Sequence, residues 1–403
     1  MAVVVVEPTL SASSRLDTLR ANIMGTLDIH GIKCSIEQDG HLLILDAKEP
    51  VDAMYALEHV FGVESICIAD RAEKGLNPLV DAIVRIGKDI MHRNERFHVE
   101  AEVLGSTKGI VARDVEFAAT AALLSELSSL DVKPSSKDDG YDRLIRVYIS
   151  GENSYVCRLC MDGSGGLPVG SNGYALCSVY DCISAVAAYV LAEHGFYPSI
   201  IVVYTDDEML RRVVKKIEVI ARMLSRKRIE LRYTYYTPNG KDDDGGGGSG
   251  DAVSCSDCSD KHYTTTVVSS LLLDRLVGVS DMGSSSNSSS SSSVIALPLS
   301  SSLHSMDFIN SVMRGMSYKN IMLPLMFSNN NNLLHYSKIF GMDCVREIQA
   351  IMSKFGESRV VDDDNYEHVN EYVEECINNM HTLEVSLGPN MVHDIIDGIR
   401  HGW

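Results

Sequence analysis

The sequence has no apolar run long enough to cross a membrane. A spanning helix needs about 18 to 20 consecutive apolar residues, and no stretch of this chain approaches that length. The opening MAVVVVEP also lacks the basic flank of a secretory signal. We therefore expect a soluble protein of the cytoplasm that makes no use of a membrane.

Cysteine and positive charge are both sparse. Ten cysteines are scattered over 403 residues, so they do not form the dense framework of a small secreted domain, and we expect most of them to be buried thiols. Lys and Arg number 36 against 55 Asp and Glu, which gives a formal net charge of -19. Phosphate contacts depend on Lys and Arg, so this balance excludes a generally basic surface that coats nucleic acid. Any RNA binding must come from a local basic patch.

The length and the order of elements predict more than one domain, because compact domains usually have about 100 to 200 residues. In residues 1–72 the strand AVVVVE, a helix at 14–27, the hairpin of IKCSIE and HLLILDA, a helix from Pro50 and the strand VESICIAD follow one another. This βαββαβ order is that of a ferredoxin-like fold. Residues 73–165 predict a second small α+β domain, with helices at 77–91 and 115–127.

Residues 166–385 show a different pattern, in which strands alternate with longer helices. The strands YALCSV, SIIVVYT and IELRYTYY are separated by helices at 184–194 and 207–224, which predicts a doubly wound, Rossmann-like α/β domain with a parallel sheet. NIMLPLM predicts a further strand, and 333–339, 344–354 and 366–381 predict helices. Low-complexity insertions near 239–262 and 283–293, and the asparagine run after Ser328, are expected to be disordered. Residues 386–403 read as a tail or short helix.

Four segments follow one another along the first half of the chain: VFGVESICIAD at 60–70, ARDVEFAA at 112–119, GSGGLPVGSNG at 163–173 and VAAYVLAEHG at 186–195. In this order they resemble the 4-thiouridine tRNA sulfurtransferase family, in which a ferredoxin-like unit and an RNA-binding THUMP domain precede a PP-loop ATPase-like domain. The resemblance covers roughly residues 1–235. Taken alone, GSGGLPVGS could be any glycine-rich turn.

The resemblance implies ATP with Mg²⁺ as cofactor, held by a Ser-Gly-Gly-x-Asp-Ser loop at the carboxyl edge of the parallel strands. The corresponding stretch here, SVYDCIS at 178–184, keeps Ser178, Asp181 and Ser184 but has no glycine and one extra residue. Val179 and Tyr180 carry side chains where the backbone should approach phosphate closely, so we expect ATP binding to be weakened or lost. The alternative is that Asp181 and Ser184 only cap the following helix.

Further nucleotide contacts are implied by the same resemblance. Ser178, Ser184 and Asp181 would face phosphate and metal, with Asp181 as a catalytic candidate. The strand ends where the family holds adenine carry Leu176, Cys177, Val203 and Tyr204. The family's Gly-Glu-Ser motif is replaced around ALPLSSSLHS at 296–305, a second departure that affects the nucleotide.

Sulfur transfer requires a thiolate that carries a persulfide, or in some relatives cysteines that hold an iron–sulfur cluster. CSDC at 255–258 resembles the family's Cys-x-x-Cys, so Cys255 and Cys258 are candidate catalytic residues, and Cys344 could be a third thiol. Since CSDC lies in a Gly/Ser-rich insertion, ordinary thiols are the alternative. Cys157 and Cys160 lie three apart on a predicted strand, so we expect them to face opposite sides, one in the core and one at the surface.

RNA recognition by a THUMP domain would use basic residues that bind the tRNA acceptor stem by shape and phosphate contact. The candidates are Arg93, Arg96, Lys108 and Arg113. Glu100 and Glu102 lie in the strand FHVEAEVLG, where they would repel phosphate. The 13 histidines are dispersed without ligand or triad spacing, and we expect most of them at the surface or at helix ends.

The sequence therefore predicts a tRNA-binding protein that resembles the ATP-dependent tRNA uridine 4-sulfurtransferases, with a weakened or lost ATP site. The alternative is a non-catalytic tRNA-binding adaptor of the same fold. If the protein is an active transferase, the resemblance implies a separate sulfur donor such as a cysteine desulfurase, because we find no rhodanese domain at the carboxyl end. A homodimer is the candidate assembly.

Overall fold

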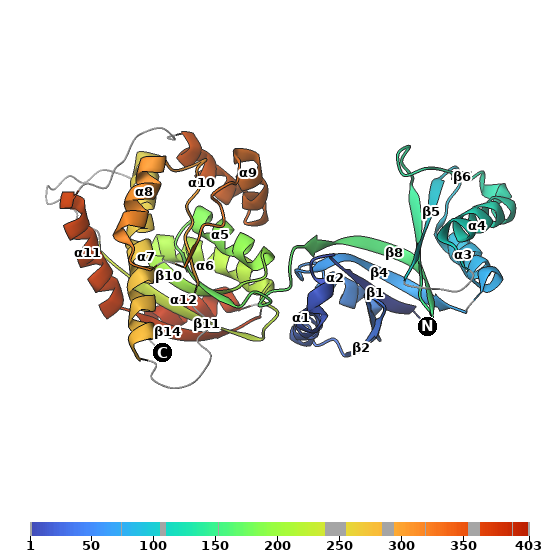
Figure 1. Cartoon of the computed structure of the whole chain (residues 1–403), viewed down its shortest axis with the longest axis horizontal. Helices are drawn as coiled ribbons and strands as arrows, with labels where there is room; N and C mark the ends of the chain where they lie inside the picture. The colour runs from blue at the N-terminus through green and yellow to red at the C-terminus, as the bar shows by residue number, and fades with distance from the viewer. Residues whose placement is uncertain are drawn as a thin grey trace. The chain divides into compact units, whose positions relative to one another are not determined.

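The chain divides into two compact units, Met1–Pro168 and Val169–Trp403 (Figure 1). The computed structural model describes residues 2–73, 75–104, 110–151, 153–237, 255–283, 294–318, 320–353, 363–388 and 390–401, with the backbone alone for 255–261, 278–283, 363–368 and 401. Within these residues no helix is long and apolar enough to cross a membrane. The division after Pro168 lies three residues beyond the predicted boundary between 165 and 166.

The first unit is built on one eight-stranded sheet with the order β2-β3-β1-β4-β8-β7-β5-β6. Its strands are β1 Ala2–Pro8, β2 Cys34–Asp39, β3 Leu42–Ala47, β4 Val63–Ala72, β5 Arg96–Val103, β6 Lys133–Pro134, β7 Arg143–Ile149 and β8 Ser154–Gly165. Strands β1 to β4 are all antiparallel to their neighbours, whereas β5 pairs parallel with β6 and β7. Because β4 and β8 are hydrogen-bonded neighbours, the sheet is continuous across residue 72. Separate domains at 1–72 and 73–165 stay a prediction.

Four α-helices cover one face of this sheet. They are α1 Leu16–Ile29, α2 Pro50–Ala56, α3 Leu76–Ile90 and α4 Ala112–Glu126, with short 3-10 turns at Ser13–Arg15 and Ser128–Leu130. Leu79, Ile83 and Ile86 of α3 repeat at helical spacing and are fully buried, as the sequence pattern predicts. Helices α1 and α2 pack on one apolar core, and α3 and α4 pack on another.

The opposite, helix-free face of the sheet carries its own buried cluster. It contains Val3, Val5, Leu42, Ile44, Cys67, Ala69, Leu104, Tyr148, Tyr155 and Cys157. The Asp39 carboxylate, at the end of β2, accepts hydrogen bonds from Tyr155 Oη at 2.7 Å and Ser150 Oγ at 2.8 Å. These bonds tie an edge strand of the sheet to the β7–β8 hairpin, so the helix-free face is closed by side chains from distant strands.

A β-bulge in β8 changes which cysteines share a face. Cys67 pairs with Cys160 and Ala69 pairs with Cys157, with the register shifting between them. Residues 67 and 69 point to the same side of β4, so Cys157 and Cys160 do as well. The prediction that they face opposite sides is wrong, because the extra residue of a bulge shifts the alternation by one. Cys67 and Cys160 form a disulfide, and Cys157 keeps a buried thiol.

The glycine-rich stretch at 163–173 ends β8 and begins the second unit. A side chain at Gly163 would place its Cβ 2.3 Å from the carbonyl oxygen of Val63 on β4. Opposite it, a Cβ on Gly62 would lie 2.8 Å from Pro168. The Gly163 backbone therefore lies against the Val63 backbone at a distance that only glycine allows. The Pro168 ring fills the space beside Gly62. These contacts explain Gly163 and Gly62 without reference to a ligand.

The second unit contains a six-stranded sheet with the order β13-β12-β9-β10-β11-β14. Its strands are β9 Tyr174–Val179, β10 Tyr197–Tyr204, β11 Arg228–Tyr235, β12 Val294–Ala296, β13 Ile321–Met322 and β14 His381–Ser386. The first five strands in this order are parallel, and β14 is an antiparallel edge. The α/β architecture with mixed sheets agrees with the predicted fold class.

The helices of this unit extend beyond those that the sequence predicts. They are α5 Cys182–Glu193, α6 Asp207–Arg222, α7 Cys255–Gly283, α8 Met306–Gly315, α9 Asn330–Ile339, α10 Met342–Ser353, α11 Asp363–Asn378 and α12 Met391–His401. Residues 255–262 lie in α7, the asparagine run caps and begins α9, and the predicted tail forms α12. The prediction of disorder is therefore wrong for residues 255–262 and for the asparagine run. The α8 helix was not predicted.

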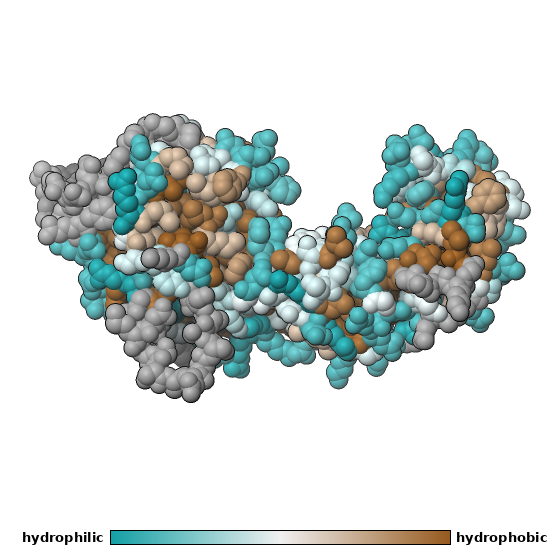
Figure 2. Space-filling view, in the orientation of Figure 1, coloured by the Kyte–Doolittle hydropathy of each residue, from teal (hydrophilic) through white to brown (hydrophobic). Residues whose placement is uncertain are grey.

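Helix α7 and helices α8 and α11 pack on one face of the second sheet around a shared apolar core. Val268, Leu272 and Leu273 of α7 are fully buried there. Hydrophobic residues gather over α7 and α8 on the face seen in Figure 2. Met313 and Met316 pack against the same core and are only partly buried. Burial against this core stabilises α7, although the adjacent sequence is of low complexity.

Candidate functional site

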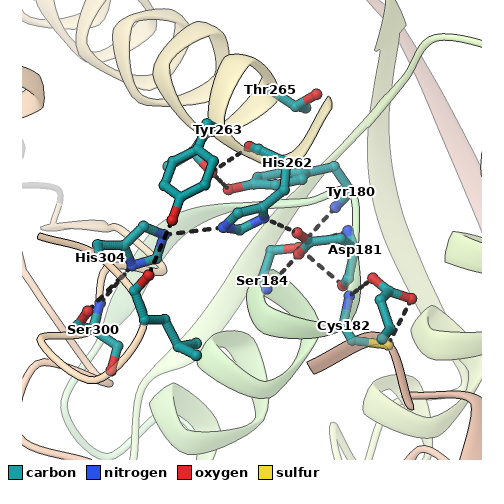
Figure 3. A network of polar contacts seen from close by, with 12 residues as sticks. Tyr180, Asp181, Cys182, Ser184, His262, Tyr263, Thr265, Ser300 and His304 are labelled. Carbon is teal, nitrogen blue, oxygen red and sulfur yellow. Dashed lines mark hydrogen bonds and ion pairs between the residues drawn. The ribbon is translucent and has the colours of Figure 1, made fainter. Parts of the chain in front are cut away.

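Three segments meet at the carboxyl edge of the second sheet. Strand β9 leads through Tyr180 and Asp181 into α5, and its neighbour β12 leads into the segment 297–305. In doubly wound sheets, ligand sites form at this edge, between neighbouring strands whose connections diverge. Helix α7 adds His262 to the same place (Figure 3).

The start of α5 is closed by its own side chains. Asp181 is the N-cap, and its Oδ1 accepts the Ser184 N–H at 2.8 Å. In return, Ser184 Oγ accepts the N–H groups of Tyr180 at 3.0 Å and Asp181 at 2.9 Å. The two residues therefore form a capping box. Capping, the alternative that the sequence left open for Asp181 and Ser184, is what the structure contains.

A second carboxylate, from α10, lies at the same helix end. Glu347 accepts the Cys182 N–H at 2.9 Å and the Cys182 thiol at 3.1 Å. The ammonium of Lys216 on α6, a buried residue, lies 3.7 Å from this carboxylate. Carboxylates are stabilised at the positive end of a helix. Counting the capping box, four backbone N–H groups around the start of α5 already have acceptors from this chain.

Two buried histidines extend the polar network from Asp181. His262 donates or shares a proton through Nδ1 with Asp181, and its Nε2 lies 3.0 Å from Nε2 of His304. His304 Nδ1 lies 3.2 Å from both the N–H and the carbonyl oxygen of Ser300. The exposed fractions of His262 and His304 are 4% and 1%. These two histidines are exceptions to the prediction that most histidines lie at the surface or at helix ends.

The network accommodates two proton arrangements. When Nδ1 of His304 accepts the Ser300 N–H, its Nε2 donates to a neutral His262, which donates to Asp181. When His262 is protonated, it donates in both directions, and Nδ1 of His304 donates to the Ser300 carbonyl instead. Both arrangements satisfy every ring nitrogen. The second arrangement holds one proton more than the first, and the two engage different backbone groups of Ser300.

Burial sets the charge of His304, at one end of this network, whereas hydrogen bonds and the neighbouring His262 set that of Asp181, at the other. Burial, with a smaller contribution from His262, lowers the pKa of His304 to about 3, so His304 is neutral at neutral pH. Burial raises the pKa of Asp181, but His262 and the hydrogen bonds from His262 and Ser184 outweigh burial and hold that pKa below its ordinary value. Asp181 is thus ionised and fully engaged.

Aromatic side chains surround the histidines. Tyr180 turns into the core, where its hydroxyl shares a hydrogen bond of 2.8 Å with Thr266 on α7. The Tyr263 hydroxyl donates to the Leu303 carbonyl at 3.2 Å, and His304 stacks on Phe308. Tyr180, which the sequence placed in the wall of a phosphate loop, instead anchors that loop to α7.

The residues predicted to hold adenine are not gathered into one pocket. Leu176 and Val203 are buried in the core beneath α7, whereas Cys177, as the strand neighbour of Leu176, faces the opposite side of the sheet. Tyr204 is half-buried against Tyr235, with ring centroids 5.8 Å apart. Ser178 is buried, and its hydroxyl makes no hydrogen bond within the part of the chain that the structure describes. Their roles in nucleotide binding stay a prediction.

Of the three candidate sulfur carriers, the structure describes the side chain of Cys344 alone. Cys255 and Cys258 lie at the start of α7, and their side chains fall outside the described residues. Cys344 is buried near the start of α10 and hydrogen-bonds with the Cys182 thiol. Burial and this contact raise the pKa of Cys182. The Cys182 thiol is therefore protonated, and Cys344 packs beside it at the start of α5.

Among the candidate RNA contacts that the structure describes, Arg93 and Arg113 lie near opposite ends of α4. Arg113 lies in the first turn of α4, whereas Arg93 precedes Asn94, whose N–H bonds to Leu130 beyond the other end of α4. A helix of 15 residues is about 22 Å long. Arg96 donates to the Asp139 carbonyl at 3.0 Å. Lys108 lies outside the described residues.

The acidic residues of β5 are partly neutralised. Glu100 pairs with Arg146 and Lys137, each at 3.2 Å. Glu102 lies 3.9 Å from His41. The expected repulsion of phosphate by Glu100 is therefore reduced by two adjacent cations.

Sequence reasoning missed His262, His304, Glu347 and Lys216. His262 is separated in sequence from Asp181 by 81 residues, His304 from His262 by 42 and Glu347 from Cys182 by 165. No local spacing in the sequence therefore indicates these contacts. The one available signal was the segment 296–305, already recognised as occupying the place of a motif near the nucleotide.

The chain was compared with known protein families, sequences and solved structures. No family model matches the chain. Probable tRNA sulfurtransferases from Streptococcus pneumoniae and Anoxybacillus flavithermus are 24% identical over 182 residues and 22% identical over 195 residues, covering 45% and 48% of this chain. The chain spans about half the length of these curated relatives, 44% and 48%.

Two solved structures match most of the chain. One is a 4-thiouridine synthetase in complex with RNA and bound ATP, with a TM-score of 0.64, 12% identity and coverage of 96% of this chain and 100% of that chain. The other is PH1313 from Pyrococcus horikoshii, with a TM-score of 0.59, 17% identity and coverage of 85% and 100%. The fold is shared with both. At these identities the likeness concerns the fold alone.

Proposed function

We propose that this protein binds tRNA and that its second unit is a scaffold that does not use ATP at residues 178–184. The tRNA part rests on the relatives named tRNA sulfurtransferases and on the fold shared with a 4-thiouridine synthetase bound to RNA. The scaffold part rests on the closed start of α5. The protein is thus the non-catalytic adaptor that the sequence left as an alternative.

The closed helix start is the observation that carries the proposal. A phosphate cradle needs free backbone N–H groups at a helix start, and here four such groups bind Ser184, Asp181 and Glu347. An incoming phosphate would have to displace these acceptors and approach the carboxylates of Asp181 and Glu347. Losing the cap alone costs about 1 kcal/mol, and the like-charge repulsion adds to it. The residues present do not fit the phosphates of ATP.

Ligand-induced stabilisation tests the scaffold part directly. A site saturated at 100 times its Kd raises the free energy of unfolding by about 2.7 kcal/mol. We expect no change in the melting temperature of the full chain with millimolar ATP and Mg²⁺. The matched positive control is the 4-thiouridine synthetase whose structure contains ATP. A melting shift that Asp181→Asn removes would overturn the proposal.

Competition binding tests the tRNA part. In a gel shift at low salt, we expect the protein to retain tRNA when an equal charge concentration of heparin is added. Because the proposed contacts lie in the first unit, Asp181→Asn and Cys255→Ser should leave this affinity unchanged. If heparin displaces labelled tRNA as effectively as unlabelled tRNA does, tRNA is not the specific partner.

The transferase alternative has its own decisive measurement. If Cys255, Cys258 or Cys344 carried sulfur to tRNA, cells without this protein would lose 4-thiouridine from tRNA. Restoring the wild-type chain would return the base, and Cys255→Ser would not. We expect the 4-thiouridine content, measured by mass spectrometry of tRNA digests, to stay unchanged. A loss would show that the chain is an active transferase.

A further inference from the structure

Three cysteines of the first unit lie together on the helix-free face of its sheet. Cys67 on β4 pairs with Cys160 on β8, and the bulge between them turns Cys157 to the same side. One Sγ atom from each lies within 4.8 Å of the other two. This group is far in sequence from the polar network of the second unit and has no part in the proposed function.

The bulge is what assembles the group. In a regular strand Cys157 and Cys160 would be separated by the sheet. The extra residue, Arg158, lies between them, and its guanidinium donates to Asp70 at 2.6 and 3.1 Å and to Asp89 at 3.2 Å. Bulges redirect side chains and are features of a fold rather than accidents. Ion pairs to β4 and α3 hold this bulge in place.

Three sulfur donors at this spacing suit a soft metal ion. Zn²⁺ binds thiolates at about 2.3 Å in tetrahedral geometry, which places the sulfurs about 3.8 Å apart. Cys67 and Cys157 are 0% and 1% exposed, whereas Cys160 is only partly buried, so the group is reachable from one side.

We propose that the reduced protein binds one Zn²⁺ ion through the thiolates of Cys67, Cys157 and Cys160. The Cys67–Cys160 disulfide of the structure and the metal-bound form exclude each other. A phosphine reductant cleaves the S–S bond to give two thiols and takes an oxygen atom from water to become its oxide. Zn²⁺ then forms three Zn–S bonds, and the three thiol protons pass to solvent. The group is thus a metal site that oxidation closes.

Cobalt titration of the full chain tests the site. Cys255→Ser and Cys258→Ser are introduced first, so that the other Cys-x-x-Cys cannot bind metal. After phosphine reduction, we expect one Co²⁺ per chain, with the intense near-ultraviolet absorption of cobalt thiolates and its loss when Zn²⁺ is added. The same protein with its disulfide intact should give no such absorption, which is a control without further substitution.

Two additional measurements separate the site from other thiols. Cys157→Ser should abolish the cobalt absorption, whereas Cys34→Ser should not, because Cys34 on β2 packs against the core on the helix-covered face. If Cys157→Ser does not fold, zinc K-edge X-ray absorption of the parent protein should still show three Zn–S bonds. The proposal fails if the reduced protein binds no cobalt, if the oxidised protein binds it equally, or if fewer than three sulfurs are found.

Discussion

The stretches 163–173 and 178–184 lie close together in the chain. The first contains a glycine that packing requires, whereas the second contains none. In the first, Gly163 lies against the Val63 carbonyl, and a side chain has no space there. The second has no glycine, Val179 and Tyr180 are buried, and the helix start is closed by side chains. Gly163 is therefore required by the protein's own backbone, whereas the helix start at 178–184 is closed by side chains and needs no glycine.

The largest effect is expected from a side chain in the first stretch. Gly163→Ala should destabilise the first unit by about 3 kcal/mol, because its Cβ would overlap backbone rather than a flexible side chain. Hydrogen exchange of the β4 and β8 amides measures this change within the first unit. Gly151→Ala is the matched control, since no atom lies within 4 Å of its Cβ position. Equal protection in the two variants would contradict the comparison.

The next largest loss of stability is expected from a substitution of Glu347, which contacts the helix start that follows residues 178–181. Glu347→Ala removes the acceptor of the Cys182 N–H and leaves the buried Lys216 without its carboxylate. We expect a loss of about 2 kcal/mol, below the usual cost of breaking a fully buried pair because Glu347 is partly exposed. Urea unfolding measures it. Lys216→Met combined with Glu347→Leu should lose less than Glu347→Ala alone, and a greater loss would argue against an unpaired ammonium as the cause.

The pH dependence of stability tests the histidine network. The pKa of His304 is about 3 in the folded protein and about 6.5 in an unfolded chain. Between these values the unfolded chain binds a proton that the folded chain does not, so stability falls as pH is lowered, by up to about 1.4 kcal/mol per pH unit. Asp181 has a lowered pKa, so its contribution is lost only below about pH 4.

His304→Gln should flatten this pH dependence between pH 5 and about 6.5, measured as urea midpoints at each pH. His335→Gln, which changes an exposed histidine on α9, should keep the wild-type slope. If the wild type and His304→Gln have the same slope, His304 is not held neutral by burial.

The smallest effect is expected for single RNA contacts. Arg93→Ala and Arg113→Ala should each weaken tRNA binding a few-fold and reduce the slope of log affinity against log salt by about 1. Because these residues lie at opposite ends of α4, their effects should add. Arg222→Ala on α6, an exposed residue paired with Glu218, is the control. An unchanged salt slope would remove either residue from the interface.

The first unit could be predicted well because its signals are local. Alternation marks β1 and β3, and the helical spacing of Leu79, Ile83 and Ile86 marks α3. The Asp181–Ser184 cap is similarly a pattern within four residues. By contrast, α7 follows a glycine-rich stretch, and only its packing in the shared core shows that it is a helix.

The missed features depend on contacts that sequence spacing does not reveal. Asp181 meets His262 across 81 residues, and His262 meets His304 across 42. The bulge at Arg158 is equally hidden, because its effect appears only when β8 is paired with β4. Regular alternation predicted the wrong face for one of the two cysteines on either side of it.

The pairing of β4 with β8 has a consequence for the folding and degradation of the first unit. A fragment that stopped at residue 72 would carry β4 with its hydrogen-bonding edge uncovered along nearly its whole length. Such an edge readily recruits strands from other chains. The two halves are therefore expected to unfold in a single cooperative step and to be degraded together.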